Sequence, residues 1–152
     1  MCYKGTYKIV KVINKEQSTQ EVLVDACIAD EIQWLNDIGV ITLGSCCSHG
    51  WAGKLYEWDA PPETGKNIVW RTHLSPPTVL LKEESVELAR KHGYLPYPYY
   101  YADGNSYGVW QMQLKTGCLT EEDCKRFYEE NKNNQEIIYI DKDEWAGRII
   151  DG

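Results

Sequence analysis

Basic side chains and long apolar runs are both scarce in this chain of 152 residues. Sixteen Lys and Arg stand against 23 Asp and Glu, giving a formal net charge of −7. This balance argues against general nucleic-acid binding, because neutralising phosphates requires clustered Lys and Arg. No 18-residue run is apolar enough to cross a membrane, and the first residues lack the apolar region of a signal peptide. We therefore expect a cytoplasmic protein without a membrane partner.

Several motifs are missing as well. The chain contains neither the GxGxxG nor the Walker A string, so no known class of nucleotide site is indicated. It has no pair of CxxC knuckles, and six Cys without a secretion signal predict thiols in a reducing compartment rather than disulfides. Phe is nearly absent, with one against eleven Tyr and six Trp. This excess favours either half-buried binding surfaces or tyrosines on exposed strand faces.

The periodic segments predict a single α+β domain over residues 1–152, with a mixed β-sheet and about three helices. A domain of this length can bury enough surface to need no disulfide or metal for its core. Strand-like segments cover 6–13, 20–24, 40–43, 67–73, 109–114, 136–140 and 145–150. Helix-like segments cover 26–38, 83–92 and 121–132, the last opened by a capping box from Thr120 to Asp123.

The clearest prediction is a strand–helix–strand unit over residues 20–43. Asp25 suits the N-cap of its helix, and Ile28, Ile32 and Leu35 recur on one helix face. If both strands join one sheet in parallel, their C-terminal ends lie at the same edge. Open α/β sheets bind ligands at that edge, and a helix N-terminus there favours anions and thiolates.

The loop at this edge, Ser45 to Trp51, combines two thiols, two hydroxyls, an imidazole and a glycine. Its backbone amides and serines suit a small anionic, nucleotide-like molecule, with Trp51 or the tyrosine-rich segment 94–101 as a stacking wall. Cys27 lies in the first helical turn, and His73 ends a strand that can point into the same site. The expected ligand-binding residues are Asp25, Cys27, Ser45, Cys46, Cys47, Ser48, His49, Gly50, Trp51 and His73.

Other uses of the loop stay open. Zinc could be held by Cys27, Cys46 and His49, with Cys47 as a further thiolate, and the chain would then be a zinc-stabilised interaction module. A thiolate at Cys46 or Cys27, stabilised by the helix N-terminus and His49, could act as a nucleophile. The loop could also be only a tight turn with buried thiols. Ligand binding, the preferred interpretation, places His49 outside the core, where truncation changes the unfolding free energy by about 0.5 kcal/mol or less.

The segment from Val24 to Gly50 carries a resemblance. Its strings VDACI, WLN, GVIT and SCCSHG are similar to the VDxCI…LN…GI.T…SCCGHG signature of small uncharacterised proteins common in phage genomes, with Ser48 in place of a glycine. They resemble more distantly the wybutosine-synthesis family of tRNA methyltransferases, whose strand and loop read TSSCSGR. The first resemblance implies a shared site position, a phage origin and action on a host metabolite or defence signal. The second implies an S-adenosylmethionine-dependent methyltransferase as the alternative. Turnover and oligomeric state, a homo-oligomer included, stay open.

Overall fold

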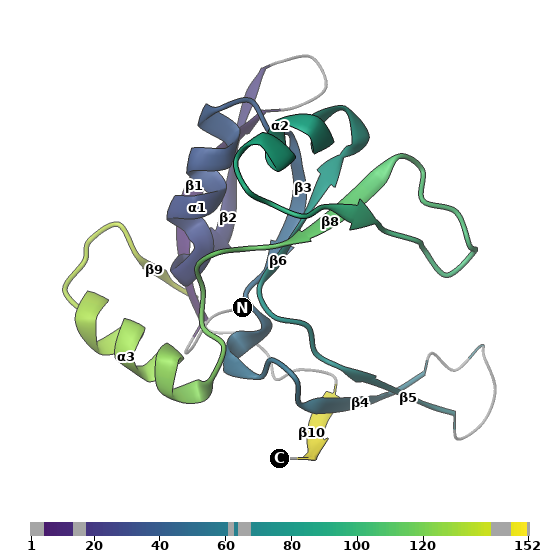
Figure 1. Cartoon of the computed structure of the whole chain (residues 1–152). Coiled ribbons are helices and arrows are strands. Elements are labelled where there is room, and N and C mark those ends of the chain that lie inside the picture. Colours follow the sequence, from purple (N-terminus) through teal and green to yellow (C-terminus); the bar gives the residue numbers. More distant parts are fainter. Residues whose placement is uncertain (1–4, 14–17, 61–62, 64–67, 141–146, 152) are drawn as a thin grey trace.

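The structure, a computed structural model, describes residues 5–13, 18–60, 63 and 68–140, and the backbone of 147–151. In that part the chain forms three sheets and three α-helices, which confirms the predicted α+β class (Figure 1). The first sheet has the strand order β2-β1-β9, the second β3-β6-β8-β7 and the third β10-β4-β5. Every ladder among the described residues is antiparallel, where the sequence predicted one mixed sheet.

The strands of the three sheets have the following bounds. They are β1 (Thr6–Ile13), β2 (Thr19–Asp25), β3 (Thr42–Cys46), β4 (Leu55–Asp59), β5 (Val69–His73), β6 (Thr78–Lys82), β7 (Tyr97–Pro98), β8 (Val109–Gln113), β9 (Ile138–Tyr139) and β10 (Gly147–Asp151). The α-helices are α1 (Ala26–Asp37), α2 (Val86–Lys91) and α3 (Glu121–Asn131), and two 3₁₀ turns are η2 (Ser48–Gly50) and η4 (Glu83–Ser85).

The predicted helices recur with small changes. α1 and α3 start where the sequence predicted, and Thr120 and Asp123 form the expected capping box at the start of α3. The predicted helix over 83–92 divides into η4 and α2. The prediction that Asp25 caps α1 with its side chain is wrong, because no capping hydrogen bond is present. Its carboxylate instead accepts a hydrogen bond from the loop that follows β3.

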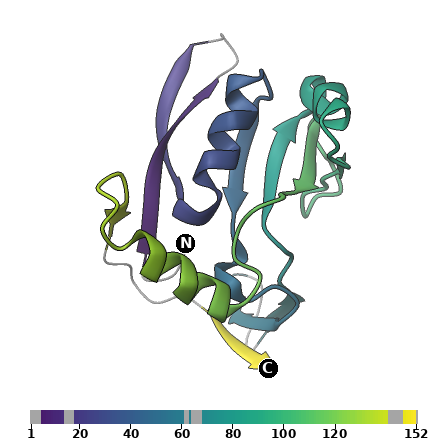
Figure 2. The same ribbon diagram turned by 60° about the vertical axis from the view of Figure 1, so that its left-hand side comes forward.

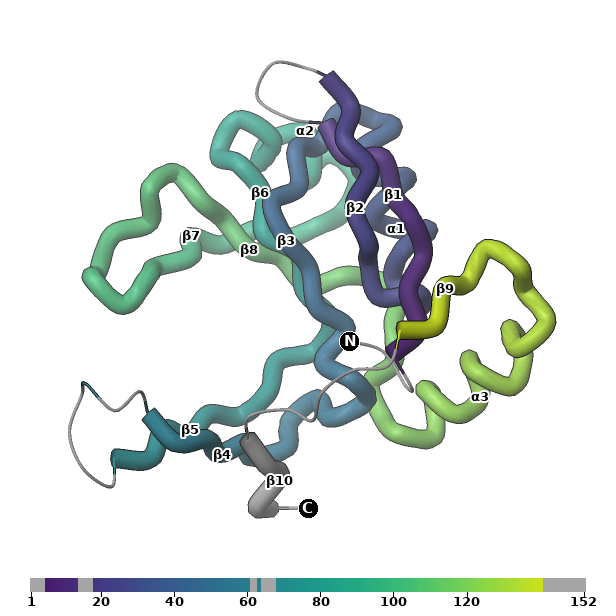
Figure 3. Tube along the Cα trace, turned by 180° about the vertical axis from the view of Figure 1, so that it is seen from behind, coloured from purple at the N-terminus to yellow at the C-terminus, as the bar shows by residue number. Residues whose placement is uncertain are grey.

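The two strands that flank α1 belong to different sheets. β2 pairs with β1, to which a short connection joins it, and β3 pairs with β6. A short connection favours the antiparallel pairing of β1 with β2. β3 instead pairs with β6, although β4 and β5 lie between them in the sequence. β2 and β3 nevertheless run side by side in the same direction (Figures 2 and 3). Both therefore end near the start of α1.

The core lies where α1 packs against these strands. The predicted face of α1 is buried, with Ile28, Ile32 and Leu35 at most 1% exposed. It packs in one cluster with residues of the first sheet, such as Val10, and of the second sheet, such as Leu81. α1 thus holds the first two sheets together and fixes the relative positions of the ends of β2 and β3.

Candidate functional site

The ends of β2 and β3 meet through a buried hydrogen bond. The backbone N–H of Cys47 donates to Oδ2 of Asp25 at 3.1 Å. Asp25 is 5% exposed and Cys47 is fully buried. The prediction that both strands end at one edge of a shared parallel sheet is therefore wrong, but the ends of the two strands do lie close together. The carboxylate expected at the helix cap instead joins the loop that follows β3.

The loop itself turns in an uncommon backbone conformation. Ser48, His49 and Gly50 have φ angles of 61°, 58° and 79°, so three successive residues are left-handed. Glycine adopts this region freely, but each of the other two residues carries a cost of about 1–2 kcal/mol. The hydroxyl of Ser48 donates to the carbonyl of Ser75, which holds the turn against the segment between β5 and β6.

Sulfur atoms flank both edges of the His49 ring. Sγ of Cys46 lies 3.7 Å from Nε2, and Sγ of Cys47 lies 3.8 Å from Nδ1. Each sulfur also accepts a backbone N–H at 3.3 Å, Cys46 from Ser48 and Cys47 from His49. The left-handed turn therefore brings the sulfur atoms of two adjacent cysteines to different nitrogens of one imidazole.

Three potential metal ligands converge among the described residues. One ligand atom each from Asp25, Cys47 and His49 lies within 4.8 Å of the other two. All three side chains are buried, and His49 is only 8% exposed. The expectation that His49 lies outside the core is therefore wrong. The ring of Trp51 packs against the His49 ring in a T-shaped arrangement, with the ring centroids 5.8 Å apart.

The start of α3 supports the loop from the other side. Trp51 forms an isolated β-bridge with Thr120 and donates from Nε1 to Oε1 of Glu121 at 2.9 Å. A Cβ added to Gly50 would lie 2.6 Å from the Thr120 carbonyl oxygen, so the two backbones are in direct contact. Gly50 and the capping box are both visible in the sequence, but nothing in the sequence indicates that the two lie in contact.

The surroundings of Cys46 do not favour a nucleophilic thiolate. Burial raises its pKa, and the nearby Asp25 carboxylate raises it further, while the Ser48 N–H lowers it in part. Because the thiolate is the reactive form, a raised pKa leaves little of it near neutral pH. Cys47 is fully buried and closed to a substrate. These facts argue against the nucleophilic interpretation of the loop.

The remaining predicted site residues lie in other surroundings. Cys27 lines a cavity of about 270 Å³ together with Cys118 and residues of α3. Ser45 is an exposed residue of β3 and lines a cavity of about 300 Å³ between β2 and β3. His73 is an exposed residue at the end of β5, in the third sheet. Of the zinc ligands considered from the sequence, His49 and the further thiolate Cys47 belong to the cluster that converges, whereas Cys27 and Cys46 do not.

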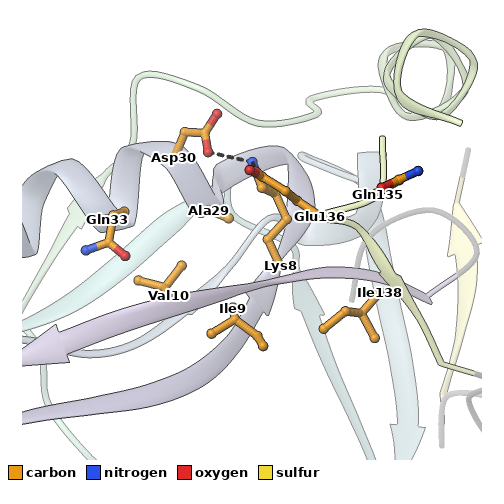
Figure 4. Close-up of a pocket in the computed structure, with 9 residues that line it drawn as sticks. All are labelled: Lys8, Ile9, Val10, Ala29, Asp30, Gln33, Gln135, Glu136 and Ile138. Atoms are coloured by element: carbon orange, nitrogen blue, oxygen red, sulfur yellow. Dashed lines mark hydrogen bonds and ion pairs between the residues drawn. The ribbon is translucent and has the colours of Figure 1, made fainter. Parts of the chain in front are cut away.

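A larger hollow lies on the outer side of α1. It has a volume of about 510 Å³ and is bordered by β1, α1 and the segment before β9 (Figure 4). Nζ of Lys8 lies 2.8 Å from Asp30 and 3.3 Å from Glu136, and the hydrogen bond that Lys8 donates to Asp30 is the main reason why the pKa of Lys8 is raised. Two carboxylates neutralise this ammonium, so the hollow is a poor site for an anion.

Comparison with family models, curated proteins and solved structures found no match. The resemblances to the phage proteins and to the methyltransferase family therefore stay predictions. No helix among the described residues is long and apolar enough to cross a membrane. The case for a function is thus carried by the cluster of Asp25, Cys47 and His49.

Proposed function

We propose that the protein binds a transition-metal ion, zinc in the first place, through Asp25, Cys47 and His49. The observation that carries this proposal is the convergence of their ligand atoms within 4.8 Å in a buried site. Ligand atoms around a tetrahedral zinc ion lie about 3.3–3.8 Å apart, given the usual zinc–sulfur and zinc–nitrogen bond lengths. The distance of 3.8 Å between Cys47 Sγ and His49 Nδ1 is close to this spacing.

The chemistry of the three side chains favours zinc over other common ions. Thiolate and imidazole are ligands of zinc and copper, whereas calcium and magnesium take oxygen ligands. The backbone already supplies part of the support that metal ligands need. Cys47 Sγ accepts the His49 N–H, and Asp25 Oδ2 accepts the Cys47 N–H, so two of the ligands are oriented by the loop.

A three-residue site leaves one position of a tetrahedral ion for another ligand. Zinc sites with three protein ligands are those at which water or a small molecule binds the metal, while structural sites are closed by four. Because the three ligands are buried, that position suits a water molecule or one small oxygen ligand. The nucleotide-like ligand stays a prediction from the sequence. The methyltransferase alternative rests on the resemblance alone.

The test is the metal content of the purified, undialysed protein, measured by inductively coupled plasma mass spectrometry. We expect close to one zinc per chain in the wild type, or uptake of one Co²⁺ after chelation and dialysis. Cys47→Ser and His49→Ala should each lose the metal. Cys124→Ser is the matched control, because Cys124 is also a buried cysteine, at 1% exposure, but lies in α3.

Circular dichroism establishes that each variant is folded before its metal is counted. A wild type that neither retains zinc nor takes up cobalt contradicts the proposal. The proposal is also wrong if Cys47→Ser binds as much metal as Cys124→Ser, since the metal would then be held elsewhere.

A further inference from the structure

We infer that Cys46 is the positioning residue of this metal site: its sulfur accepts the Nε2–H of His49 and so presents Nδ1 to the metal. The inference rests on the proposed metal site and assigns a role to the second cysteine of the pair. The two cysteines are adjacent in sequence, yet the structure places them at opposite edges of the imidazole. A metal bound to one ring nitrogen therefore lies near one of the two sulfurs, so we assign the two cysteines different roles.

The proposed metal, taken together with these contacts, selects one tautomer of the imidazole. A neutral imidazole has one protonated nitrogen and one that accepts, and a metal binds the nitrogen that lacks the proton. Nδ1 faces Cys47, whose sulfur belongs to the converging cluster. The proton then lies on Nε2, which faces Cys46 Sγ at 3.7 Å. Ligating histidines usually donate their other N–H to an acceptor, which fixes the orientation of the ring.

Cys46 is held for this task by the backbone of the loop. Its sulfur accepts the Ser48 N–H at 3.3 Å, so its position relative to the turn is fixed from the chain itself. Cys46 is the last residue of β3, paired with Thr78 of β6, which fixes the backbone from which the side chain projects. The sulfur is therefore placed by a strand and a turn rather than by the metal.

The competing assignment makes Cys46 a fourth metal ligand. A metal on Nδ1 lies in the ring plane on the side away from Nε2, so the present position of Cys46 is on the wrong edge of the imidazole. The two assignments differ in the number of thiolates on the metal, which is one if Cys46 positions the ring and two if it is a ligand. Cobalt substitution counts them, because the thiolate-to-cobalt charge-transfer absorption scales with the number of such bonds.

The experiment compares Co²⁺-loaded wild type, Cys46→Ala, Cys46→Ser and Cys47→Ser. We expect a one-thiolate spectrum in the wild type, the same spectrum in Cys46→Ala with affinity lower by about 10–100-fold, and partial recovery of affinity in Cys46→Ser, which keeps an acceptor. Cys47→Ser should lose the band. In the zinc-loaded protein, long-range ¹H–¹⁵N spectra should show the His49 proton on Nε2.

The possible negative results separate the role inferred for Cys46 from the proposed metal site. A two-thiolate spectrum that halves in Cys46→Ala makes Cys46 a ligand and overturns the inference while leaving the proposed function in place. Unchanged affinity in Cys46→Ala, or a proton on Nδ1, also overturns the inference alone. A wild type that binds no cobalt at all overturns the proposed function and the inference together.

Discussion

Gly50 determines how closely the loop of the candidate site approaches α3. Its φ of +79° is left-handed, and a Cβ at this position would lie 2.6 Å from the carbonyl oxygen of Thr120. Gly53 has nearly the same φ, +80°, but a Cβ there would meet nothing within 4 Å. The two glycines therefore separate the cost of a left-handed backbone from the cost of a steric clash.

We expect Gly50→Ala to lower the free energy of unfolding clearly more than Gly53→Ala. Both pay for the left-handed conformation, about 1–2 kcal/mol, and Gly50→Ala must in addition move the loop away from the Thr120 backbone. Urea unfolding of the two variants measures the difference. Equal losses would mean that the loop and the start of α3 do not touch in solution.

At the scale of single residues, the sequence indicated the loop of the candidate site but not the role of each residue in it. The mixture of thiols, hydroxyls and imidazole at positions 45–51 identified the loop. The sequence could not tell Cys46 from Cys47, because their roles depend on the left-handed turn that follows them. It also assigned Asp25 to the helix cap. The hydrogen bond from Cys47 to Asp25 depends on where the loop lies in space, which local sequence does not indicate.

At the scale of elements, a buried carboxylate ties α1 to the segments that precede β7 and follow β8. Glu31, 9% exposed, accepts from the backbone of Lys115 and Thr116, both at 2.8 Å, and from the hydroxyls of Thr116 and Tyr94, both at 2.6 Å. Burial, together with this carboxylate, raises the pKa of Tyr94 well above its usual range. The helix that starts at the site is thus anchored near its middle.

Glu31→Gln tests this anchor. The amide keeps the size of the side chain but replaces one acceptor oxygen by a donor, which then faces N–H and O–H donors. Hydrogen bonds to charged groups contribute about 1.5–3 kcal/mol, so we expect a loss in that range by urea unfolding. Glu87→Gln is the control, because Glu87 is exposed and, among the described residues, forms an ion pair with Arg90 in the same helix. Similar losses in the two variants would contradict the anchor.

Local sequence patterns predicted which segments form helices better than they predicted which strands pair with one another. Apolar periodicity and the capping box located α1 and α3, which depend on contacts within a few residues. The sequence assigned no strand to 55–59, which is β4 and pairs with β5 and β10. It also expected one sheet where there are three. Strand partners are chosen by contacts between distant segments, and one sequence carries little information about those.

At the scale of the whole molecule, the candidate site lies where separate parts of the fold meet. Asp25 comes from the first sheet, Cys47 follows a strand of the second, and the turn contacts both α3 and the segment between β5 and β6. A metal bound here would connect these parts and would stabilise the folded state only. Its contribution to stability should therefore depend on its concentration by mass action.

Leu35→Ala separates this contribution from that of the core. Leu35 is fully buried, so truncation should cost about 2–5 kcal/mol. It lies ten residues after Asp25, about 15 Å along the helix axis, and distant sites act additively within about 0.3–0.5 kcal/mol. Saturating zinc should therefore stabilise wild type and Leu35→Ala equally, by about 2.7 kcal/mol at a hundredfold excess over Kd.

Urea unfolding with buffered zinc and with chelator gives both quantities, and Cys47→Ser should show no zinc effect. A zinc effect that disappears in Leu35→Ala would show that site and core do not act independently, and one that persists in Cys47→Ser would place the metal elsewhere.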